Sequence, residues 1–242
     1  MRNALIVGGS SGIGLSIATK LSERNDCAKV YIVDRKPIID RYMNPKFEYH
    51  QFDLTNSDYS VFNKFVDVDT LMITAGFGKL ALFNELDEQY IIDSMLVNSI
   101  AVMRIIHHFY HKIQSNIDFY CGVMGSISGF VSSPFFSVYG ASKAALKIFI
   151  ESVNVELVKF GTTNRILNVS PGAISGTAFY NGLTDLEKLC PLTDEIIYRL
   201  YNKDDLFVPM YDEIYKEVLE RYHKDFRAEG IHSYEYKEKN KR

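Results

Sequence analysis

The sequence contains few cysteines, no excess of basic residues and no long apolar run. Its three cysteines, Cys27, Cys121 and Cys190, are odd in number and have no metal-site spacing, which indicates reduced thiols and a cytoplasmic protein. The net charge of −3 gives no basic face for nucleic acid, so no nucleic-acid partner is expected. No apolar run approaches the ~20 residues that cross a bilayer, so no membrane partner is expected.

The chain also lacks internal repeats, low-complexity tracts and a linker rich in proline or glycine. Its 242 residues, of which 47% are hydrophobic, suit one large α/β domain over residues 1–242 better than two small ones. The first apolar run begins at Ala4, so no signal peptide is expected.

Short apolar runs alternate with helical patterns along the chain, which predicts a parallel sheet with helices on both faces. This is a doubly wound, three-layer α/β fold of the Rossmann type. The strands are expected at residues 4–7, 30–33, 47–52, 70–73, 117–123 and 166–169. The helices are expected after residue 12 and at about 57–65, 87–113 and 138–160.

The stretch from Gly8 to Gly14 joins the first expected strand to the first helix. Gly8 lets the chain turn sharply, and Gly12 and Gly14 lack Cβ atoms, so a pyrophosphate and the sheet can approach the backbone. The N–H groups and the positive end of the new helix then face the phosphates. The same loop contains Ser10, Ser11 and Ile13.

Asp34 ends the second expected strand, 20 residues beyond Gly14. This distance is close to the roughly 20 residues expected for an acid that binds the ribose hydroxyls of adenosine. A carboxylate there repels the 2′-phosphate of NADP, so NAD is the expected cofactor. NADP is the alternative, because the neighbouring Arg35 could hold that phosphate. In the plainest alternative, Asp34 only caps a turn.

Tyr139 and Lys143 lie four residues apart in an expected helix and therefore on the same face. A free tyrosine has a pKa of about 10 and is a poor base at neutral pH. A nearby ammonium stabilises the phenolate and lowers that pKa, so the pair could exchange a proton with an alcohol oxygen. Taken alone, such a pair is more typical of a solvated helix face.

Together these motifs closely resemble those of the classical short-chain dehydrogenase/reductase family. The stretch Gly8–Gly14 is similar to its cofactor motif, and Tyr139 with Lys143 matches its Tyr-x-x-x-Lys motif. Ser126, 13 residues before Tyr139, falls at the family's catalytic serine, and Asn98 falls at the asparagine of its catalytic tetrad. The match runs from residue 1 to about residue 177 and includes two turns, Ala75-Gly76 and Pro171-Gly172.

The resemblance implies a role for each residue of the tetrad. Tyr139 would be the general acid/base, and Lys143 would bind the nicotinamide ribose and favour the Tyr139 phenolate. Ser126 would polarise the substrate oxygen, and Asn98 would hold a water that relays the proton. A hydride would then move between the nicotinamide and the substrate carbon.

The resemblance also implies which residues contact the cofactor besides Asp34. They are Gly8, Ser10, Ser11, Gly12, Ile13, Gly14, Arg35, Asp53, Leu54, Ala75, Gly76, Tyr139, Lys143, Pro171, Gly172, Ile174 and Thr177. Thr177 comes one position later than the family's threonine, so Ser175 is an alternative for the contact with the nicotinamide amide. Ile73-Thr74 replaces two asparagines, which is expected to remove hydrogen bonds that brace the central strand.

The C-terminal part departs from the family pattern, because it has no seventh strand that ends in Asp-Gly-Gly. Residues 174–205 are expected to form a substrate lid. Residues 206–208 are expected to form at most a truncated strand, followed by a helix over 211–226 and a polar tail, frayed or bound to a partner, over 229–242. A homodimer or homotetramer is expected from the family.

The favoured hypothesis is an NAD-dependent alcohol dehydrogenase or ketone reductase that acts on a small-molecule alcohol or carbonyl. A non-catalytic NAD(P)-binding regulator is the alternative, although such proteins typically lose the tyrosine or the lysine. An epimerase or dehydratase of the extended branch is disfavoured by the length. His107 and His111 could form a metal pair, but without a third ligand a solvated or dimer-facing surface is favoured, and no metal is expected.

Overall fold

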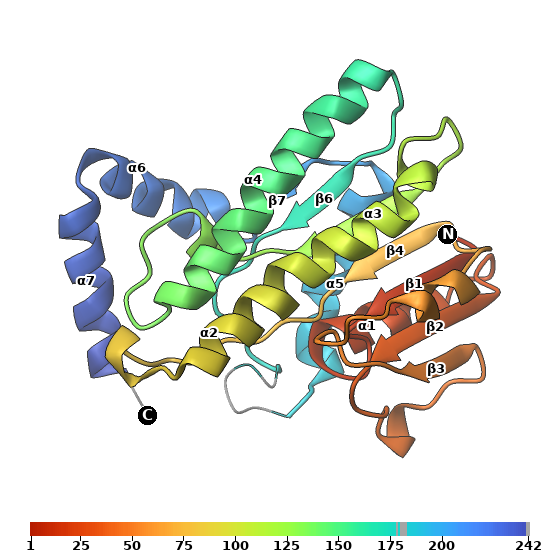
Figure 1. Cartoon of the computed structure of the whole chain (residues 1–242), viewed down its shortest axis with the longest axis horizontal. Coiled ribbons are helices and arrows are strands. Elements are labelled where there is room, and N and C mark those ends of the chain that lie inside the picture. The colour runs from red at the N-terminus through yellow and green to blue at the C-terminus, as the bar shows by residue number, and fades with distance from the viewer. Residues whose placement is uncertain (178, 180–182, 241–242) are drawn as a thin grey trace.

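Seven parallel strands form one sheet in the computed structural model, which describes residues 1–177, 179 and 183–240 (Figure 1). The strand order is β3-β2-β1-β4-β5-β6-β7. The strands are β1 (Asn3–Val7), β2 (Lys29–Asp34), β3 (Phe47–Gln51), β4 (Thr70–Ile73), β5 (Tyr120–Met124), β6 (Ile166–Val169) and β7 (Leu206–Phe207). The prediction of a Rossmann-type doubly wound fold is therefore confirmed.

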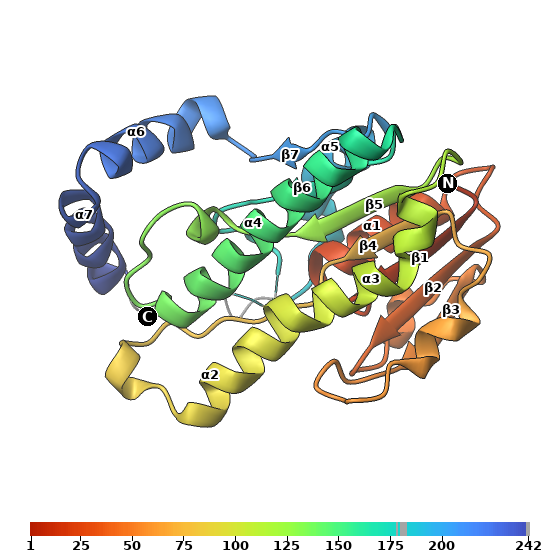
Figure 2. The same cartoon turned by 45° about the horizontal axis from the view of Figure 1, so that its top comes forward.

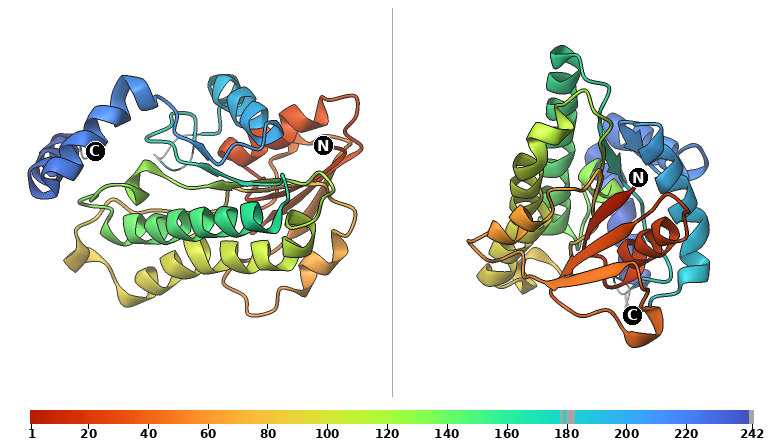
Figure 3. Two further views of the ribbon diagram at one scale, coloured as in Figure 1. Left: turned by 90° about the horizontal axis from the view of Figure 1, so that it is seen from above. Right: turned by 90° about the vertical axis from the view of Figure 1, so that its right-hand side faces the viewer.

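Helices cover both faces of the sheet, which Figure 3 shows edge-on in its left view. One face carries α3 and α4, and α2 leads directly into α3. The other face carries α1 and α5. The helices are α1 (Gly12–Ser22), α2 (Glu88–Met95), α3 (Ala101–Ile113), α4 (Ser137–Phe160), α5 (Leu186–Tyr201), α6 (Lys216–Lys224) and α7 (Phe226–Lys239). Two π-helical segments lie at Leu96–Ile100 and Tyr211–Tyr215, and short 3₁₀ helices lie at Asp40–Tyr42, Ser60–Lys64, Phe83–Glu85 and Ile127–Gly129.

The alternation of side chains along β1 divides the core into two layers. Leu5 and Val7 pack toward α3 and α4, whereas Ala4 and Ile6 pack toward α1 and α5. All four side chains are buried, because a parallel strand covered on both faces has no solvent side. This burial explains the uninterrupted apolar run in the sequence.

The strand order places the chemistry-bearing turns at one edge of the sheet. The chain moves from β1 outward to β2 and β3, then returns to β4 on the other side of β1. Ligands of open α/β sheets bind at this reversal, outside the carboxyl ends of the strands. The turns after β1, β2, β4, β5 and β6 therefore meet where a dinucleotide is expected.

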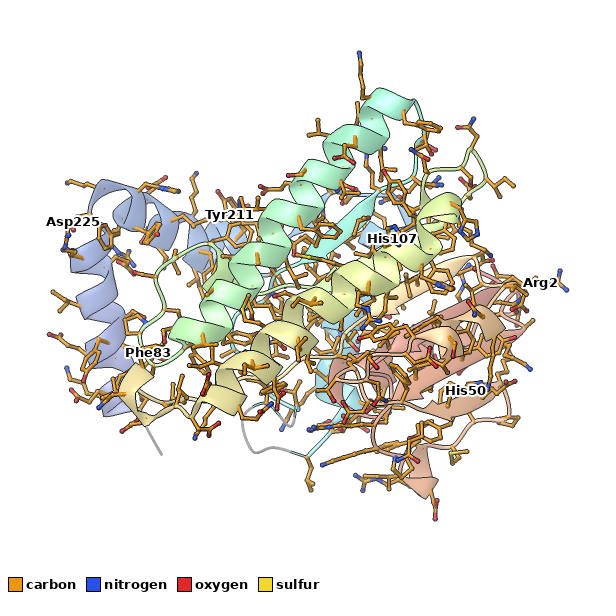
Figure 4. All side chains as sticks on the ribbon, in the orientation of Figure 1. Arg2, His50, Phe83, His107, Tyr211 and Asp225 are labelled. Atoms are coloured by element: carbon orange, nitrogen blue, oxygen red, sulfur yellow. The ribbon has the colours of Figure 1, made fainter. Side chains whose placement is uncertain are left out.

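Most of the C-terminal tail, which is predicted from the sequence to be frayed or bound to a partner, is helical, because residues 229–239 belong to α7. Its N-terminus is capped by Asp225, whose carboxylate accepts from the N–H groups of Arg227 and Ala228. Arg221 of α6 pairs with the nearly buried Glu229 of α7 at 2.6 Å, which ties the two helices together. In Figure 4, Asp225 marks the turn of this hairpin.

Some element boundaries also differ from the predictions. The helix expected at 57–65 is only the 3₁₀ turn Ser60–Lys64, and the stretch expected as one helix at 87–113 contains the π-helical segment Leu96–Ile100. The truncated strand is β7, which pairs with β6 in parallel. The predicted lid includes α5, while residues 178 and 180–182 lie outside the described residues.

Thr74 braces the central strands, contrary to the expectation that its replacement of an asparagine removes such bonds. Its hydroxyl lies 3.1 Å from the carbonyl oxygen of Val7 and 3.0 Å from that of Gly8. The backbone N–H of Thr74 also donates to Val7 at 2.8 Å. A short hydroxyl is sufficient here because the end of β1 lies directly beside the end of β4.

Within the described residues, one helical stretch, Glu88–Ile113, is long and apolar enough to cross a membrane by length and composition alone. This corrects the expectation that no segment reaches that length. Ile105, Ile106 and Phe109 of this stretch are buried in the core layer shared with α4. The core helix of a globular α/β fold satisfies the same criterion, and these contacts assign the stretch to that class.

We predict that Thr74→Val lowers the free energy of unfolding by about 1–2 kcal/mol, because the hydroxyl donor to two backbone oxygens is lost. Urea unfolding followed by circular dichroism measures this change. Thr74→Ser, which keeps the hydroxyl, is the matched control and should lose less. A Val variant as stable as the Ser variant would contradict the bracing role.

Candidate active site

The glycine loop turns directly from β1 into α1, as the close packing around it requires. Gly8 has φ +88° and Gly12 has φ +53°, a region that side chains rarely occupy. A Cβ at Gly14 would overlap the carbonyl oxygen of Gly8 and the hydroxyl of Thr74. The first turn of α1 therefore lies against the ends of β1 and β4, and its N-terminal N–H groups open toward the crevice.

One of these N–H groups already holds an oxygen acceptor from a distant segment. The N–H of Gly12 donates to the hydroxyl oxygen of Thr184 at 2.9 Å, and Tyr42 donates from its hydroxyl to the Thr184 carbonyl oxygen at 3.0 Å. The Gly12 N–H thus points out of the helix toward the Thr184 hydroxyl. This arrangement fits a phosphate group, whose oxygen could replace the hydroxyl.

Asp34 lies beside the glycine loop at the end of β2. Its carboxylate accepts from the N–H of Ser10 at 3.1 Å and from that of Lys36 at 3.3 Å. Arg35 is exposed, and its carbonyl oxygen accepts from Gln51. Asp34 therefore caps its own turn, and its carboxylate lies beside the glycine loop.

The turn after β3 contains the two residues expected near the adenine. The Asp53 carboxylate accepts from the N–H and the hydroxyl of Thr55, and these bonds lower the pKa of Asp53. Leu54 is buried in the core layer of α3 and α4. Asp53 is thus held in place by its own turn.

Asn98 lies in the π-helical segment Leu96–Ile100 and is fully buried. Its amide accepts from the N–H of Phe77 at 3.0 Å and donates to the Phe77 carbonyl oxygen at 2.9 Å. It also donates to Ser142 of α4 at 3.1 Å. Asn98 therefore joins the turn after β4 to α4. Its position in a π-helical segment is typical of functional sites.

Lys143 is buried at the bottom of the site. Its ammonium donates to the carbonyl oxygen of Met124, the last residue of β5, at 2.7 Å. A Cβ at Gly76 would lie 3.4 Å from the Lys143 nitrogen and 3.1 Å from the Asn98 side-chain oxygen, so the Gly76 turn lies against both side chains. Burial lowers the pKa of Lys143 to about 8.

Tyr139 is nearly buried one helical turn before Lys143 and is surrounded by aromatic rings. The Lys143 nitrogen lies 5.7 Å from the centroid of the Tyr139 ring. The centroids of Phe136 and Phe179 lie 5.6 Å and 5.3 Å from that of Tyr139. A Cβ at Gly78 would come within 3.1 Å of the Tyr139 ring. The tyrosine is thus in an apolar environment with a cation nearby.

Ser126 follows β5 and caps the 3₁₀ turn Ile127–Gly129. Its hydroxyl oxygen accepts from the N–H of Ser128 at 3.2 Å. The N–H of Ile127 donates to the Pro171 carbonyl oxygen at 3.1 Å, so the serine turn is joined to the turn after β6. The cap orients the Ser126 oxygen through one lone pair, and a hydroxyl oxygen has two.

The turn after β6 contacts both the glycine loop and the C-terminal segment. The hydroxyl of Thr177 donates to the Ile174 carbonyl oxygen at 3.0 Å, and its methyl group lies 3.8 Å from a Cβ placed on Gly12. A Cβ on Gly172 would overlap the hydroxyl of Tyr215. The aromatic side chain of Tyr215 therefore lies directly on Gly172.

A hollow of about 670 Å³ lies next to Thr184, the residue that accepts from the Gly12 N–H. Its lining residues are Arg41, Tyr42, Gly176, Leu183, Thr184, Asp185, Leu186, Glu187 and Lys188. None of the four tetrad residues lines it. The hollow is therefore a space between the lid and the turn at Arg41, separate from the tetrad.

Three residues with contacts at the site, Tyr42, Thr184 and Tyr215, are not predicted from the sequence. Thr184 and Gly12 are 172 positions apart, and their contact depends on the path of the lid. Tyr42 and Tyr215 lie outside every spacing that the motifs define, so no local pattern could have singled them out. Their positions follow only from the folded chain.

A family model of short chain dehydrogenases matches residues 2–187, and the chain belongs to this family. Human 17-beta-hydroxysteroid dehydrogenase type 1 is 29% identical over 210 residues, which cover 81% of this chain and 61% of the human protein. The chain thus spans less than two thirds of that relative.

Two solved structures share the fold. A short chain dehydrogenase/reductase from Burkholderia phymatum, in complex with NAD, has a TM-score of 0.79 and 16% identity, with 94% of each chain covered. A short chain dehydrogenase from Burkholderia cenocepacia, in complex with NADP, has a TM-score of 0.77 and 22% identity, with 96% of this chain and 99% of that chain covered. Both likenesses cover nearly the whole chain.

We predict that Lys143→Met stabilises the folded protein near pH 6.5 by about 1–3 kcal/mol, because an ammonium is removed from the interior at the expense of one hydrogen bond. Since the pKa of Lys143 is lowered to about 8, the unfolded chain binds more protons between pH 8 and 10.5, the ordinary pKa of lysine. The stability of the wild type therefore rises relative to the variant across this interval. Urea unfolding at several pH values measures the difference.

Lys147→Met on the same helix is the matched control, because Lys147 is partly exposed and pairs with Glu151. It removes no buried ammonium, so it should not stabilise the folded protein near pH 6.5. A Lys143→Met protein that is less stable than the wild type near pH 6.5 would contradict the prediction.

Proposed function

We propose that the protein is an oxidoreductase that transfers a hydride between a nicotinamide cofactor, NAD in preference to NADP, and the carbon of a secondary alcohol or ketone. The observation that carries the proposal is the joint position of Tyr139, Lys143 and Asn98. All three are buried at the turn that follows β4, where Asn98 and Lys143 lie against Gly76 and the Tyr139 ring lies against Gly78. Ser126 extends this arrangement from the end of β5.

The chain offers groups for each part of the cofactor. The N-terminus of α1, with the Gly12 N–H, would hold the pyrophosphate, and Asp34 would accept from the ribose hydroxyls of the adenosine. Asp53 and Leu54 would lie near the adenine. The nicotinamide end would contact Ala75, Gly76, Lys143, and the turn from Pro171 to Thr177. When bound, the nicotinamide would supply or accept the hydride.

The protein's own residues would handle the proton and orient the substrate. Tyr139 would give a proton to the carbonyl oxygen during reduction and take it back during oxidation. The Lys143 ammonium, in the same low-dielectric site, would stabilise the Tyr139 phenolate. Ser126 would donate its hydroxyl proton to the substrate oxygen, because its oxygen is already oriented by the Ser128 N–H.

The substrate site would be apolar and aromatic. Phe136 and Phe179 both face the Tyr139 ring, and Tyr215 lies on Gly172 near the nicotinamide end. Flat or extended apolar groups bury well against such rings. The human relative is a hydroxysteroid dehydrogenase by name, so ketosteroids belong in the set of substrates to test.

The oligomeric state and location are part of the same proposal. Ile148, Val155 and Val158 of α4 are each more than half exposed, which supports a homodimer or homotetramer through this helix. The three cysteines are free, which supports a cytoplasmic enzyme.

Tyr139→Phe should lower turnover by at least about 100-fold, because the general acid/base is removed while the ring and its packing stay. The measurement is NADH and NADPH oxidation with a panel of ketosteroids, acyl ketones, keto-sugars and quinones. Val138→Ala, at the neighbouring position of the same helix, controls for local disturbance. Turnover unchanged in Tyr139→Phe would refute the catalytic assignment, whereas tight NADH binding without turnover would favour a regulator.

Asp34→Ala should shift cofactor preference toward NADPH by at least about tenfold in kcat/KM, because the charge that repels the 2′-phosphate is gone. The kcat/KM ratio for NADH and NADPH measures the shift. Arg35→Ala is the paired variant and should weaken NADPH use alone. A wild type that prefers NADPH, and loses this preference in Arg35→Ala, would show that Arg35 sets the choice.

A further inference from the structure

The C-terminal hairpin of α6 and α7 packs on residues 127–136, which belong to the loop between β5 and α4. Figures 1 and 2 both place this loop beside α7. The hydroxyl of Ser132 lies 3.4 Å from the carbonyl oxygen of Phe226, and the Phe135 ring stacks on Tyr234 with centroids 4.7 Å apart. The hairpin lies outside the residues 2–187 that match the family model, so that match does not account for these contacts.

The loop contains a strained residue that needs such support. Phe135 has φ +65°, a left-handed conformation that is strained for a residue with a side chain. Its carbonyl oxygen accepts from the N–H of Ala81, and its ring is held by Tyr234. The conformation of the loop therefore depends on contacts from outside it.

Lys237 of α7 makes the most specific of these contacts. Its ammonium donates to the Ser133 hydroxyl at 2.8 Å and to the Pro134 carbonyl oxygen at 3.0 Å, and it lies 5.4 Å from the centroid of the Phe136 ring. Among the described residues, no carboxylate lies within ion-pair distance of Lys237. Burial lowers the pKa of Lys237 to about 8, so the contact is made against a desolvation cost.

A chain of hydrogen bonds runs from this lysine to Ser126. The Ser133 hydroxyl lies 3.4 Å from that of Ser128, and the N–H of Ser128 donates to the Ser126 hydroxyl at 3.2 Å. The cap that orients the Ser126 oxygen is therefore connected to α7 through two serines. The bond from Ser133 ends on the Ser128 hydroxyl and the cap is made by the Ser128 backbone, so the connection passes through Ser128 itself.

The same anchor also reaches Tyr139. Phe136, under the Lys237 ammonium, packs on the Tyr139 ring with centroids 5.6 Å apart. A shift of the loop would therefore move a wall of the tyrosine's environment together with the serine. A displacement of about 1 Å at a reacting group can lower the rate by about 100-fold.

We propose that Lys237 is a positioning residue for the reaction: it anchors the loop 127–136 to α7 and so keeps Ser126 and Phe136 in place for catalysis at Tyr139. This inference rests on the proposed function, in which Ser126 and Tyr139 act on the substrate oxygen. In this proposal the hairpin of α6 and α7 contributes to catalysis by positioning the loop 127–136.

The test compares Lys237→Met with the wild type in the full-length protein. We expect kcat/KM for the carbonyl substrate found in the panel to fall by about 10- to 100-fold, with NADH affinity unchanged, because the glycine loop is remote from the anchor. Ser133→Ala should give a similar loss, and the double variant should lose no more than the larger single loss.

Hydrogen–deuterium exchange without cofactor tests the anchor independently of activity. Peptides from residues 127–136 should exchange about tenfold faster in Lys237→Met, while peptides from β1 and α1 stay unchanged. Lys239→Met removes an exposed charge from the same helical turn and should behave as the wild type.

Two outcomes would overturn the inference. One is a Lys237→Met protein whose loop exchange equals that of Lys239→Met, and the other is faster exchange throughout the protein, which would mean a merely structural role. If the wild type oxidises NADH with none of the carbonyl compounds in the panel, the proposed function is refuted instead. The exchange result would still decide whether Lys237 anchors the loop.

Discussion

The close approach of α1 to the ends of β1 and β4 is the constraint on which the site depends. No side chain fits at Gly14, because Gly8 and the Thr74 hydroxyl occupy the space. Thr74 in turn bonds the Val7 and Gly8 carbonyl oxygens and holds the two strand ends together. These contacts fix where α1 begins, and so they fix the direction in which the Gly12 N–H points.

The burial of Lys143 and Asn98 gives the site order at the expense of stability. The Lys143 ammonium is buried and donates to a backbone carbonyl oxygen. The Asn98 amide accepts from the Phe77 N–H and donates to the Phe77 carbonyl oxygen. Buried polar groups keep a fixed geometry, because breaking one of their hydrogen bonds leaves a donor or acceptor unpaired in the interior. The Lys143 ammonium is therefore buried at the expense of stability, and the hydrogen bonds of Asn98 keep the surrounding backbone in place.

The parts predicted from sequence are those that depend on local spacing. The strand, glycine turn and helix around Gly12 follow from neighbouring residues, and Tyr139 and Lys143 share a helix face because they are four positions apart. The contact of Thr184 with Gly12 could not be predicted, since it joins segments 172 positions apart. Likewise α7 has no apolar stripe that announces a packed helix, and its order comes from contacts such as Phe135 with Tyr234.

The π-helical segment Leu96–Ile100 has a consequence for how this region tolerates change in length. Such a segment holds one residue more than an α-helix with the same path, and each residue turns an α-helix by about 100°. Loss of that extra residue would restore a regular α-helix and leave Ile105 and Phe109 against the sheet, whereas loss of a residue between these two would turn one of them away from it. The extra residue therefore shapes the backbone around Asn98 and not the core face of α3.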